Sequence, residues 1–168
     1  MERLILLRHG KAERDSASGD DFARRLTARG RSDAREAGAR LAEMGFVPDL
    51  CLVSDAARTR DTWEALSPVC PACPARFEPD LYHAEAGKVW EMVQAAGADG
   101  ARTLMVIGHN PGLHELVVRL LAEGGASPDL MAMARSRFPT SAAAVFLFDD
   151  AGRPIYDGLL LPPRGGYD

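Results

Sequence analysis

Short runs of apolar residues alternate along this chain with longer stretches in which apolar residues recur every three or four positions. The runs predict buried strands at residues 4–7, 50–53 and 103–107. The helical spacing predicts helices from Thr27 to about Met44, after Ser54, from about Ala86 to Ala96, and after Asn110. Because Thr27, Ser54 and Asn110 are suitable N-cap residues, each is expected directly before its helix.

The C-terminal third of the chain predicts a different connection. Segments 142–148 and 155–161 have strand character, and a turn signal at 149–152 joins them, so they are expected to form an antiparallel hairpin. The stretch after Gly124 is polar and is expected to be a surface link. Strands that alternate with helices form a mostly parallel sheet covered on both faces. We therefore expect an α/β protein with one domain over residues 1–168, a three-layer α/β/α sandwich with an antiparallel C-terminal hairpin.

Composition and charge narrow the class of protein. Of the 168 residues, 46% are hydrophobic and 26% are charged, which is typical of a globular chain. The formal net charge of −4 argues against a general nucleic-acid-binding protein, and no apolar run is long enough for a membrane span. The three cysteines, Cys51, Cys70 and Cys73, cannot all pair with one another, which agrees with a reducing compartment. A cytoplasmic protein is therefore expected.

One cysteine motif imitates a phosphatase signature. Cys70 and Arg76 have the C-x5-R spacing of cysteine-dependent phosphatases, whose loop binds phosphate through successive backbone N–H groups. Pro71 and Pro74 remove two of those donors. As a metal site, the C-x-x-C of Cys70 and Cys73 lacks a second pair of ligands at suitable spacing. We assign neither function to this stretch.

Side chains that could bind or react with a ligand directly follow the predicted strands. Arg8 and His9 come after the first strand, and His109 comes after the strand at 103–107, next to the start of a helix. Arg58 lies close to the first turn of the helix after the second strand, where backbone N–H groups and the helix dipole also favour an anion. Because the carboxyl ends of parallel strands share one edge of a sheet, these four side chains are expected to converge in one pocket.

This set of side chains suits phosphoryl transfer. Two guanidiniums bind a phosphate dianion through forked hydrogen bonds, and a neutral imidazole can attack phosphorus while its other ring nitrogen is held by an acceptor. A metal site fits less well, because Arg8 beside His9 would repel a cation and no carboxylate accompanies either histidine at ligand spacing. Gly10 is expected to serve the turn after His9.

Other polar residues are interpreted as ordinary surface groups. Lys11, Arg24 and Arg25 could reach an anion but are expected on a solvated loop that spans residues 11–25. Asp61 is expected to be a surface charge, and His114 is expected to be exposed because it lies off the apolar face of its helix.

Several motifs together, in this order along the chain, carry a family resemblance. They are Arg8-His9-Gly10, Ser54-x-x-x-Arg58-x-x-x-Thr62 and Gly108-His109-Asn110-Pro111-Gly112, accompanied by Leu26-Thr27-x-x-Gly30 and Phe138-Pro139-Thr140-Ser141. This set resembles the histidine phosphatase superfamily, also called phosphoglycerate-mutase-like. The resemblance implies that His9 is a nucleophile that becomes phosphorylated, and that Arg8, Arg58 and His109 complete the phosphate-binding pocket. It also implies that water hydrolyses the phosphohistidine without a metal or another cofactor.

Within the superfamily, the chain is similar to the small bacterial phosphohistidine phosphatases. It has no long insertion between Arg58 and His109 of the kind that caps the site in the mutases, and an uncapped site suits phosphohistidine on another protein. A phosphatase for a small phosphoester stays open as an alternative, with Lys11 and residues 15–25 as a specificity wall. A non-catalytic phosphate-binding module is a third interpretation, which no feature of the sequence favours.

The general acid is the point at which this chain departs from larger relatives. They carry a glutamate in the stretch that here is Leu81-Tyr82-His83-Ala84-Glu85. His83 stands nearest the expected place with Glu85 close by, so each is a candidate general acid or substrate contact. An imidazole leaving group has different proton demands from an alkoxide, which makes a missing carboxylate tolerable for phosphohistidine.

Overall fold

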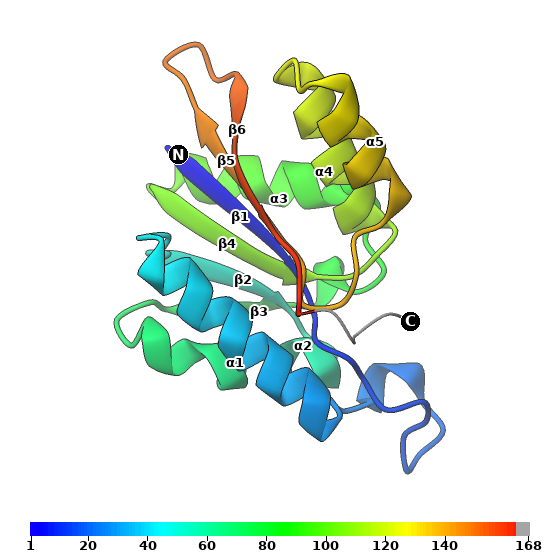
Figure 1. The fold of residues 1–168 in the computed structure, drawn as a ribbon. Helices are drawn as coiled ribbons and strands as arrows, with labels where there is room; N and C mark the ends of the chain where they lie inside the picture. Colours follow the sequence, from blue (N-terminus) through cyan, green and yellow to red (C-terminus); the bar gives the residue numbers. More distant parts are fainter. Residues whose placement is uncertain (164–168) are drawn as a thin grey trace.

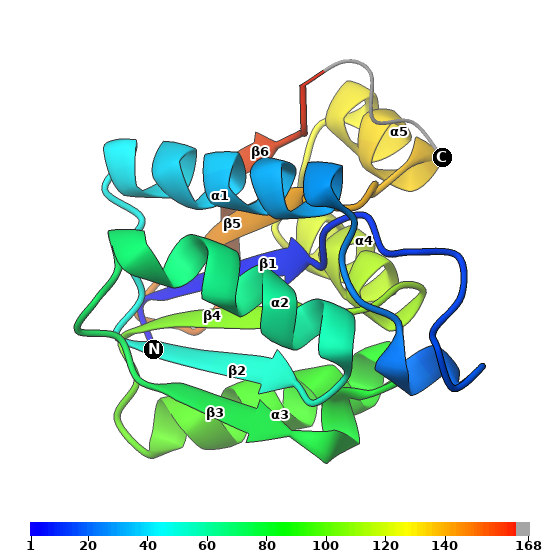
Figure 2. The ribbon, with the colours of Figure 1, turned by 90° about the horizontal axis from the view of Figure 1, so that it is seen from below.

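The computed structural model describes residues 1–163, which form a six-stranded sheet with helices on both faces (Figures 1 and 2). The strands are β1 (Arg3–Arg8), β2 (Leu50–Ser54), β3 (Ala75–Glu78), β4 (Thr103–Gly108), β5 (Ala143–Phe148) and β6 (Pro154–Leu160). The helices are α1 (Ala28–Glu43), α2 (Ala57–Leu66), α3 (Ala86–Ala98), α4 (Gly112–Glu123) and α5 (Pro128–Ser136), with short 3-10 helices at Asp21–Ala23, Ser67–Val69 and Pro79–Leu81. In this part of the chain, none of the helices combines the length and apolarity that crossing a bilayer requires. Residues 164–168 of the expected domain lie outside the described range.

The strand order is β3-β2-β4-β1-β5-β6. Strands β1 to β4 pair in parallel, whereas β5 runs antiparallel to both β1 and β6. Arg8 at the end of β1 is in register with Gly108 at the end of β4, so the next residues, His9 and His109, leave the sheet at the same edge. The predicted α/β/α sandwich with an antiparallel C-terminal hairpin is confirmed.

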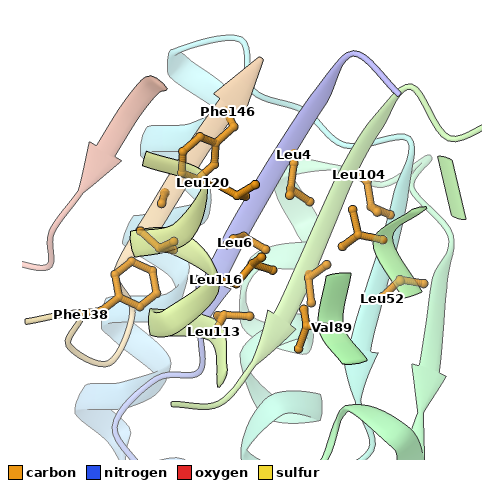
Figure 3. Close-up of a cluster of buried hydrophobic side chains, with 14 of the residues drawn as sticks. Leu4, Leu6, Leu52, Val89, Leu104, Leu113, Leu116, Leu120, Phe138 and Phe146 are labelled. Atoms are coloured by element: carbon orange, nitrogen blue, oxygen red, sulfur yellow. The ribbon is translucent and has the colours of Figure 1, made fainter. Parts of the chain in front are cut away.

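Each face of the sheet has its own apolar core. On one face, Leu4 and Leu6 of β1 belong to a cluster with buried residues of α3 and α4 (Figure 3). The cluster also includes Ala134 of α5. On the other face, Ile5 and Leu7 belong to a cluster with buried residues of α1 and α2. Successive residues of a strand point to opposite faces. Burial on both faces therefore explains why the strand is a continuous apolar run rather than an alternating one.

Two helix starts differ from the prediction. Helix α2 begins at Ala57, and Ser54, the expected N-cap, is instead the last residue of β2. Helix α4 begins at Gly112, after a cis Asn110–Pro111 peptide bond, so Asn110 is not its N-cap. In both places the polar side chain binds a distant group, which the local sequence does not reveal.

Helix α5 lies where the sequence predicted only a polar link. Ser127 caps this helix by accepting a hydrogen bond from the backbone of Leu130. Only Ala134 of this helix is buried, but Ser127 followed by Pro128 is a helix-start signal that our interpretation of a polar link overlooked. His114 of α4, expected to be exposed, is half-buried and donates from Nε2 to the Ala134 carbonyl oxygen at 2.6 Å. This hydrogen bond joins α4 to α5.

A buried carboxylate holds the loop after His9 to the sandwich. Asp61 of α2 is only 3% exposed and accepts hydrogen bonds from the Arg25 side chain at 2.9 Å and the Leu26 N–H at 3.0 Å. An Arg31 guanidinium nitrogen lies 2.9 Å from the same carboxylate. The prediction that Asp61 is a surface charge is wrong, because three donors from another part of the chain compensate its burial.

Two glycines allow the chain after His9 to pass close to α1. A Cβ on Gly10 would lie 2.5 Å from the Gly30 carbonyl oxygen, and a Cβ on Gly30 would lie 2.0 Å from the Lys11 carbonyl oxygen. Neither glycine has a positive φ. Gly10 therefore serves the close approach of two backbone segments and not the turn that we expected.

We expect Gly30→Ala to lower the free energy of unfolding by about 3 kcal/mol, because the added Cβ collides with backbone that directly follows His9. Gly87→Ala is the matched control, since Gly87 is also helical but exposed, with open space at its Cβ position. Alanine there should leave stability unchanged or raise it by up to about 1 kcal/mol. Urea denaturation measures both changes, and equal midpoints would contradict this packing constraint.

Candidate active site

A cavity of about 340 Å³ lies where β1 and β4 end. Its lining residues are mostly polar or charged: Arg8, His9, Lys11, Ala12, Asp21, Arg24, Arg58, His83, His109, Asn110 and Thr140. Thus Arg8, His9, Arg58 and His109, which the sequence singled out, share one cavity with His83, whereas Glu85 is not part of its lining.

The His9 ring has a defined tautomer. Its Nδ1 lies 2.7 Å from the Gly10 carbonyl oxygen, which can only accept, so Nδ1 carries the hydrogen and Nε2 keeps its lone pair. The Gly10 N–H donates to Thr62 Oγ1 at 3.0 Å, and this hydroxyl donates to the Arg58 carbonyl oxygen at 2.7 Å. Helix α2 therefore fixes the backbone that orients His9.

His109 is held beside His9 by a residue that the sequence assigned to another task. The two ring centroids are 5.2 Å apart. His109 Nε2 lies 2.7 Å from Ser54 Oγ, and both side chains are buried. The expectation that Ser54 caps α2 is wrong, because its hydroxyl binds this imidazole. The next residue, Asn110, donates from its amide to the Phe138 carbonyl oxygen at 2.9 Å.

His9 and His109 are uncharged at neutral pH. Burial lowers the pKa of His9 to about 3, and the positive charges of Arg58, Arg8 and Arg24 act in the same direction against the opposing hydrogen bond to Gly10. Burial, with the neighbouring His9 and Arg58, lowers the pKa of His109 to about 2. The His9 Nε2 lone pair is therefore available at neutral pH.

Polar atoms in the cavity walls have unused hydrogen-bonding capacity. Arg8 donates from Nη1 to the Phe138 carbonyl oxygen at 3.0 Å, but its Nε has no partner among the described residues. The same is true of Nε in Arg58, whose side chain is 4% exposed, and of Nδ1 in His109. Buried polar atoms without partners require an explanation, and a bound ligand is one. Two guanidiniums beside two neutral imidazoles suit an oxyanion.

The loop 11–25 takes part in the site, although it was expected to be a solvated connection. Lys11 and Arg24 line the cavity, whereas Arg25 turns to Asp61. Sequence reasoning missed Asp21, which binds Arg58 through both its carboxylate and its backbone carbonyl oxygen. The sequence offers no signal for it, because Glu13, Asp15 and Asp20 lie in the same polar stretch.

The loop before α3 brings His83 to the cavity in a strained conformation. His83 has φ of 55°, its ring stacks on Tyr82 with centroids 4.0 Å apart, and its Nε2 lies 3.5 Å from Asp21 Oδ2. Glu85 instead directly precedes α3 as its N-cap residue, and its carbonyl oxygen accepts from the Val89 N–H. Of the two candidate general acids, only His83 stands at the cavity.

The three cysteines are free, and none of them lines the cavity. Cys51 and Cys70 lie in the apolar core between the sheet and helices α1 and α2. In residues 1–163, no group of three or more histidine, cysteine, aspartate or glutamate side chains is arranged to hold a metal ion. Metal independence itself stays a prediction from the resemblance.

Comparisons with known proteins show which family the chain is similar to. The family model of the histidine phosphatase superfamily (branch 1) matches residues 4–112. An uncharacterised chloroplast protein of Arabidopsis thaliana is 31% identical over 95% of this chain and 78% of its own length.

Two solved structures are similar to this chain over nearly its whole length. A protein of Agrobacterium tumefaciens, described as a candidate phosphohistidine phosphatase SixA, is 30% identical with a TM-score of 0.81, over 96% of this chain and 98% of that one. The protein histidine phosphatase SixA complexed with tungstate is 28% identical with a TM-score of 0.74, over 95% of this chain and 97% of that one. The chain belongs to the histidine phosphatase superfamily.

Proposed function

We propose that this protein is a metal-independent phosphatase that hydrolyses phosphohistidine on other proteins through a phosphorylated His9. One observation carries the proposal: a neutral His9, with Nδ1–H bound to the Gly10 carbonyl oxygen, shares one cavity with the guanidiniums of Arg8 and Arg58. Such a pocket can bind a phosphoryl group and attack it with one of its own side chains.

In the first step, His9 Nε2 attacks phosphorus and forms a P–N bond while the bond to the leaving group breaks, and the electron pair of that bond stays on the leaving atom. The hydrogen on Nδ1 stays in place, so the phosphorylated ring becomes cationic, and the Gly10 carbonyl oxygen stabilises it by accepting that hydrogen. Arg8 and Arg58 offset the negative charge of the transferring phosphoryl oxygens, and His109 lines the cavity beside them.

In the second step, water attacks the same phosphorus and the P–N bond breaks. Its electron pair returns to Nε2, which restores neutral His9, and a proton of the water passes to the phosphate or to a nearby base. His83 is the group we propose for proton exchange at the cavity mouth, since its Nε2 is 3.5 Å from Asp21 and its side chain is 65% exposed.

Two observations favour a protein substrate over a small phosphoester. The residues between Arg58 and His109 form the rest of α2, then β3, α3 and β4 with short connections. No segment among them is long enough to form a cap over the cavity. The similar structures reported above also carry phosphohistidine phosphatase names. A small phosphoester as substrate, or phosphate binding without turnover, stays as an outcome of the tests.

We expect His9→Ala to lower kcat/KM for phosphohistidine by at least about 1,000-fold, because the substitution removes the proposed nucleophile. Incubation of the unmodified protein with a labelled phosphodonor should give acid-labile, base-stable label on His9, detected by mass spectrometry. His114→Asn is the control: His114 is half-buried on α4 and does not line the cavity, so this variant should be labelled normally. Full turnover by His9→Ala would disprove the mechanism.

A substrate panel tests the second part of the proposal. At equal concentrations, a phosphohistidine protein should give a kcat/KM at least about tenfold above those of sugar phosphates and nucleotides, because an open site accepts a large partner. The reverse ratio would make the small-phosphoester alternative the better one. Binding of phosphate or vanadate with no hydrolysis of any compound would favour a non-catalytic module.

The lowered pKa of His9 predicts a pH dependence of stability in the absence of phosphate. The unfolded chain has the ordinary pKa of 6.5 and so binds more protons than the folded chain as the pH falls toward about 3. Stability is lost on acidification, by about 2 kcal/mol between pH 7 and pH 5 for each such histidine. Urea denaturation of His9→Asn should therefore show a fall smaller by about that amount. An equal fall in both proteins would contradict a neutral His9.

A further inference from the structure

Asp21 is the only carboxylate among the described residues that line the cavity, which it shares with Arg8, Lys11, Arg24 and Arg58. Its Oδ2 accepts from Arg58 Nη2 at 3.1 Å and from the Tyr82 hydroxyl at 2.7 Å, and its Oδ1 accepts from Arg24 Nε at 2.9 Å. The Asp21 carbonyl oxygen accepts from Arg58 Nη1 at 2.8 Å. Three donors from separate parts of the chain therefore hold this carboxylate at the cavity wall.

The Asp21 carboxylate keeps capacity for a substrate group. Two carboxylate oxygens offer about four acceptor positions. Arg58 and Tyr82 donate to Oδ2, which also has His83 Nε2 at 3.5 Å, whereas Oδ1 accepts only from Arg24 among the described residues and keeps one position. The side chain is 45% exposed, so a group in the cavity can reach it. The hydrogen bond from Tyr82 and the charges of Arg58 and Arg24 hold the pKa of Asp21 well below its usual range. Asp21 is therefore an acceptor and not a general acid.

We propose that Asp21 is a specificity-determining residue that favours a phosphorylated imidazole, whose free ring nitrogen donates a hydrogen bond when it is protonated, and disfavours phosphate esters that carry a second anionic group. This inference rests on the proposed function of the same cavity. An added anionic group would lie near a fixed carboxylate, and like charges in a partly desolvated site repel each other.

The chemistry of the leaving group explains why such an acceptor helps. When His9 Nε2 attacks phosphorus, the P–N bond of the substrate breaks and its electron pair stays on the leaving nitrogen. If the other ring nitrogen carries a proton, the group departs as neutral imidazole and needs no proton at that moment. Asp21 stabilises this protonated form by accepting its N–H. The carboxylate thus acts on imidazole departure without donating a proton.

A purely structural role for Asp21 predicts a different result. Both Nη atoms of Arg58 bind Asp21, so this residue also orients the guanidinium. If orientation were its only task, removal of the charge would lower kcat/KM for all substrates by the same factor. Three substrates that share the phosphoryl group and differ in the leaving group separate these roles.

The experiment compares Asp21→Asn with the unmodified protein on phosphoimidazole, p-nitrophenyl phosphate and phosphoglycerate. We expect kcat/KM to fall about tenfold for phosphoimidazole, to change less than about twofold for p-nitrophenyl phosphate, and to rise about tenfold for phosphoglycerate, which carries a carboxylate. Asp20→Asn is the matched control, because it removes the same charge at the neighbouring position. The Asp20 side chain is exposed, accepts from the Phe22 N–H and does not line the cavity. This variant should leave all three values within about twofold.

Each outcome decides the proposal. A uniform fall for the three substrates, or equal effects of Asp20→Asn and Asp21→Asn, would overturn the role of Asp21 as a selector while leaving the proposed phosphatase intact. If the unmodified protein hydrolyses esters but not phosphoimidazole, the proposed function fails. In that case, a rise for phosphoglycerate relative to p-nitrophenyl phosphate in Asp21→Asn would still support the repulsive part of the inference, and no rise would refute it.

Discussion

The parallel pairing of β1 with β4 is the constraint on which the rest of the site depends. It sets Arg8 opposite Gly108, so that two strands more than ninety residues apart in sequence deliver His9 and His109 to the same edge, with ring centroids 5.2 Å apart. A shift of one residue in this register would exchange the two faces of a strand that is buried on both sides. The apolar packing of both sheet faces therefore fixes the geometry of polar groups that lie beyond it. Ser54, at the end of β2 on the other side of β4, reaches His109 for the same reason.

The positive charge of the arginines in and around the cavity is the second constraint, and two carboxylates, Asp21 and Asp61, compensate part of it. Arg58 is 3% exposed and shares its Nη atoms with Asp21, while the outer arginines, Arg25 and Arg31, are balanced by buried Asp61. Removal of one partner of a buried charge is costly, so each carboxylate stabilises a specific position of the loop 11–25. The compensation at the centre is incomplete, because the Nε atoms of Arg8 and Arg58 have no partner in the described part of the chain.

The sequence predicted what local pattern controls. Apolar runs located β1, β2 and β4. They also located Arg8, His9 and His109, because these polar residues directly follow the apolar runs in the sequence. What it did not predict depends on partners far away. Asp61 has the pattern of a surface residue until Arg25, Arg31 and Leu26 N–H are brought to it, and Ser54 has the pattern of an N-cap until the pairing of β2 with β4 brings it to His109. Helix α5 was missed because its start signal at Ser127 and Pro128 was overlooked, and Asp21 because nothing in a polar loop indicates which carboxylate turns inward.

The same physical cause that prepares His9 for attack also limits the lifetime of its phosphorylated form in the proposed mechanism. Burial and the neighbouring guanidiniums disfavour a positive charge on this ring, as its lowered pKa records. Once Nε2 is phosphorylated, the ring carries that positive charge while Nδ1 stays protonated against the Gly10 carbonyl oxygen. The phosphoryl oxygens satisfy the guanidiniums, but the cationic ring remains a good leaving group in a site that prefers it neutral. Loss of the phosphoryl group to water restores the preferred charge state. An arrangement of this kind favours hydrolysis over storage of the phosphoryl group, and it achieves this with the buried cations that bind the substrate.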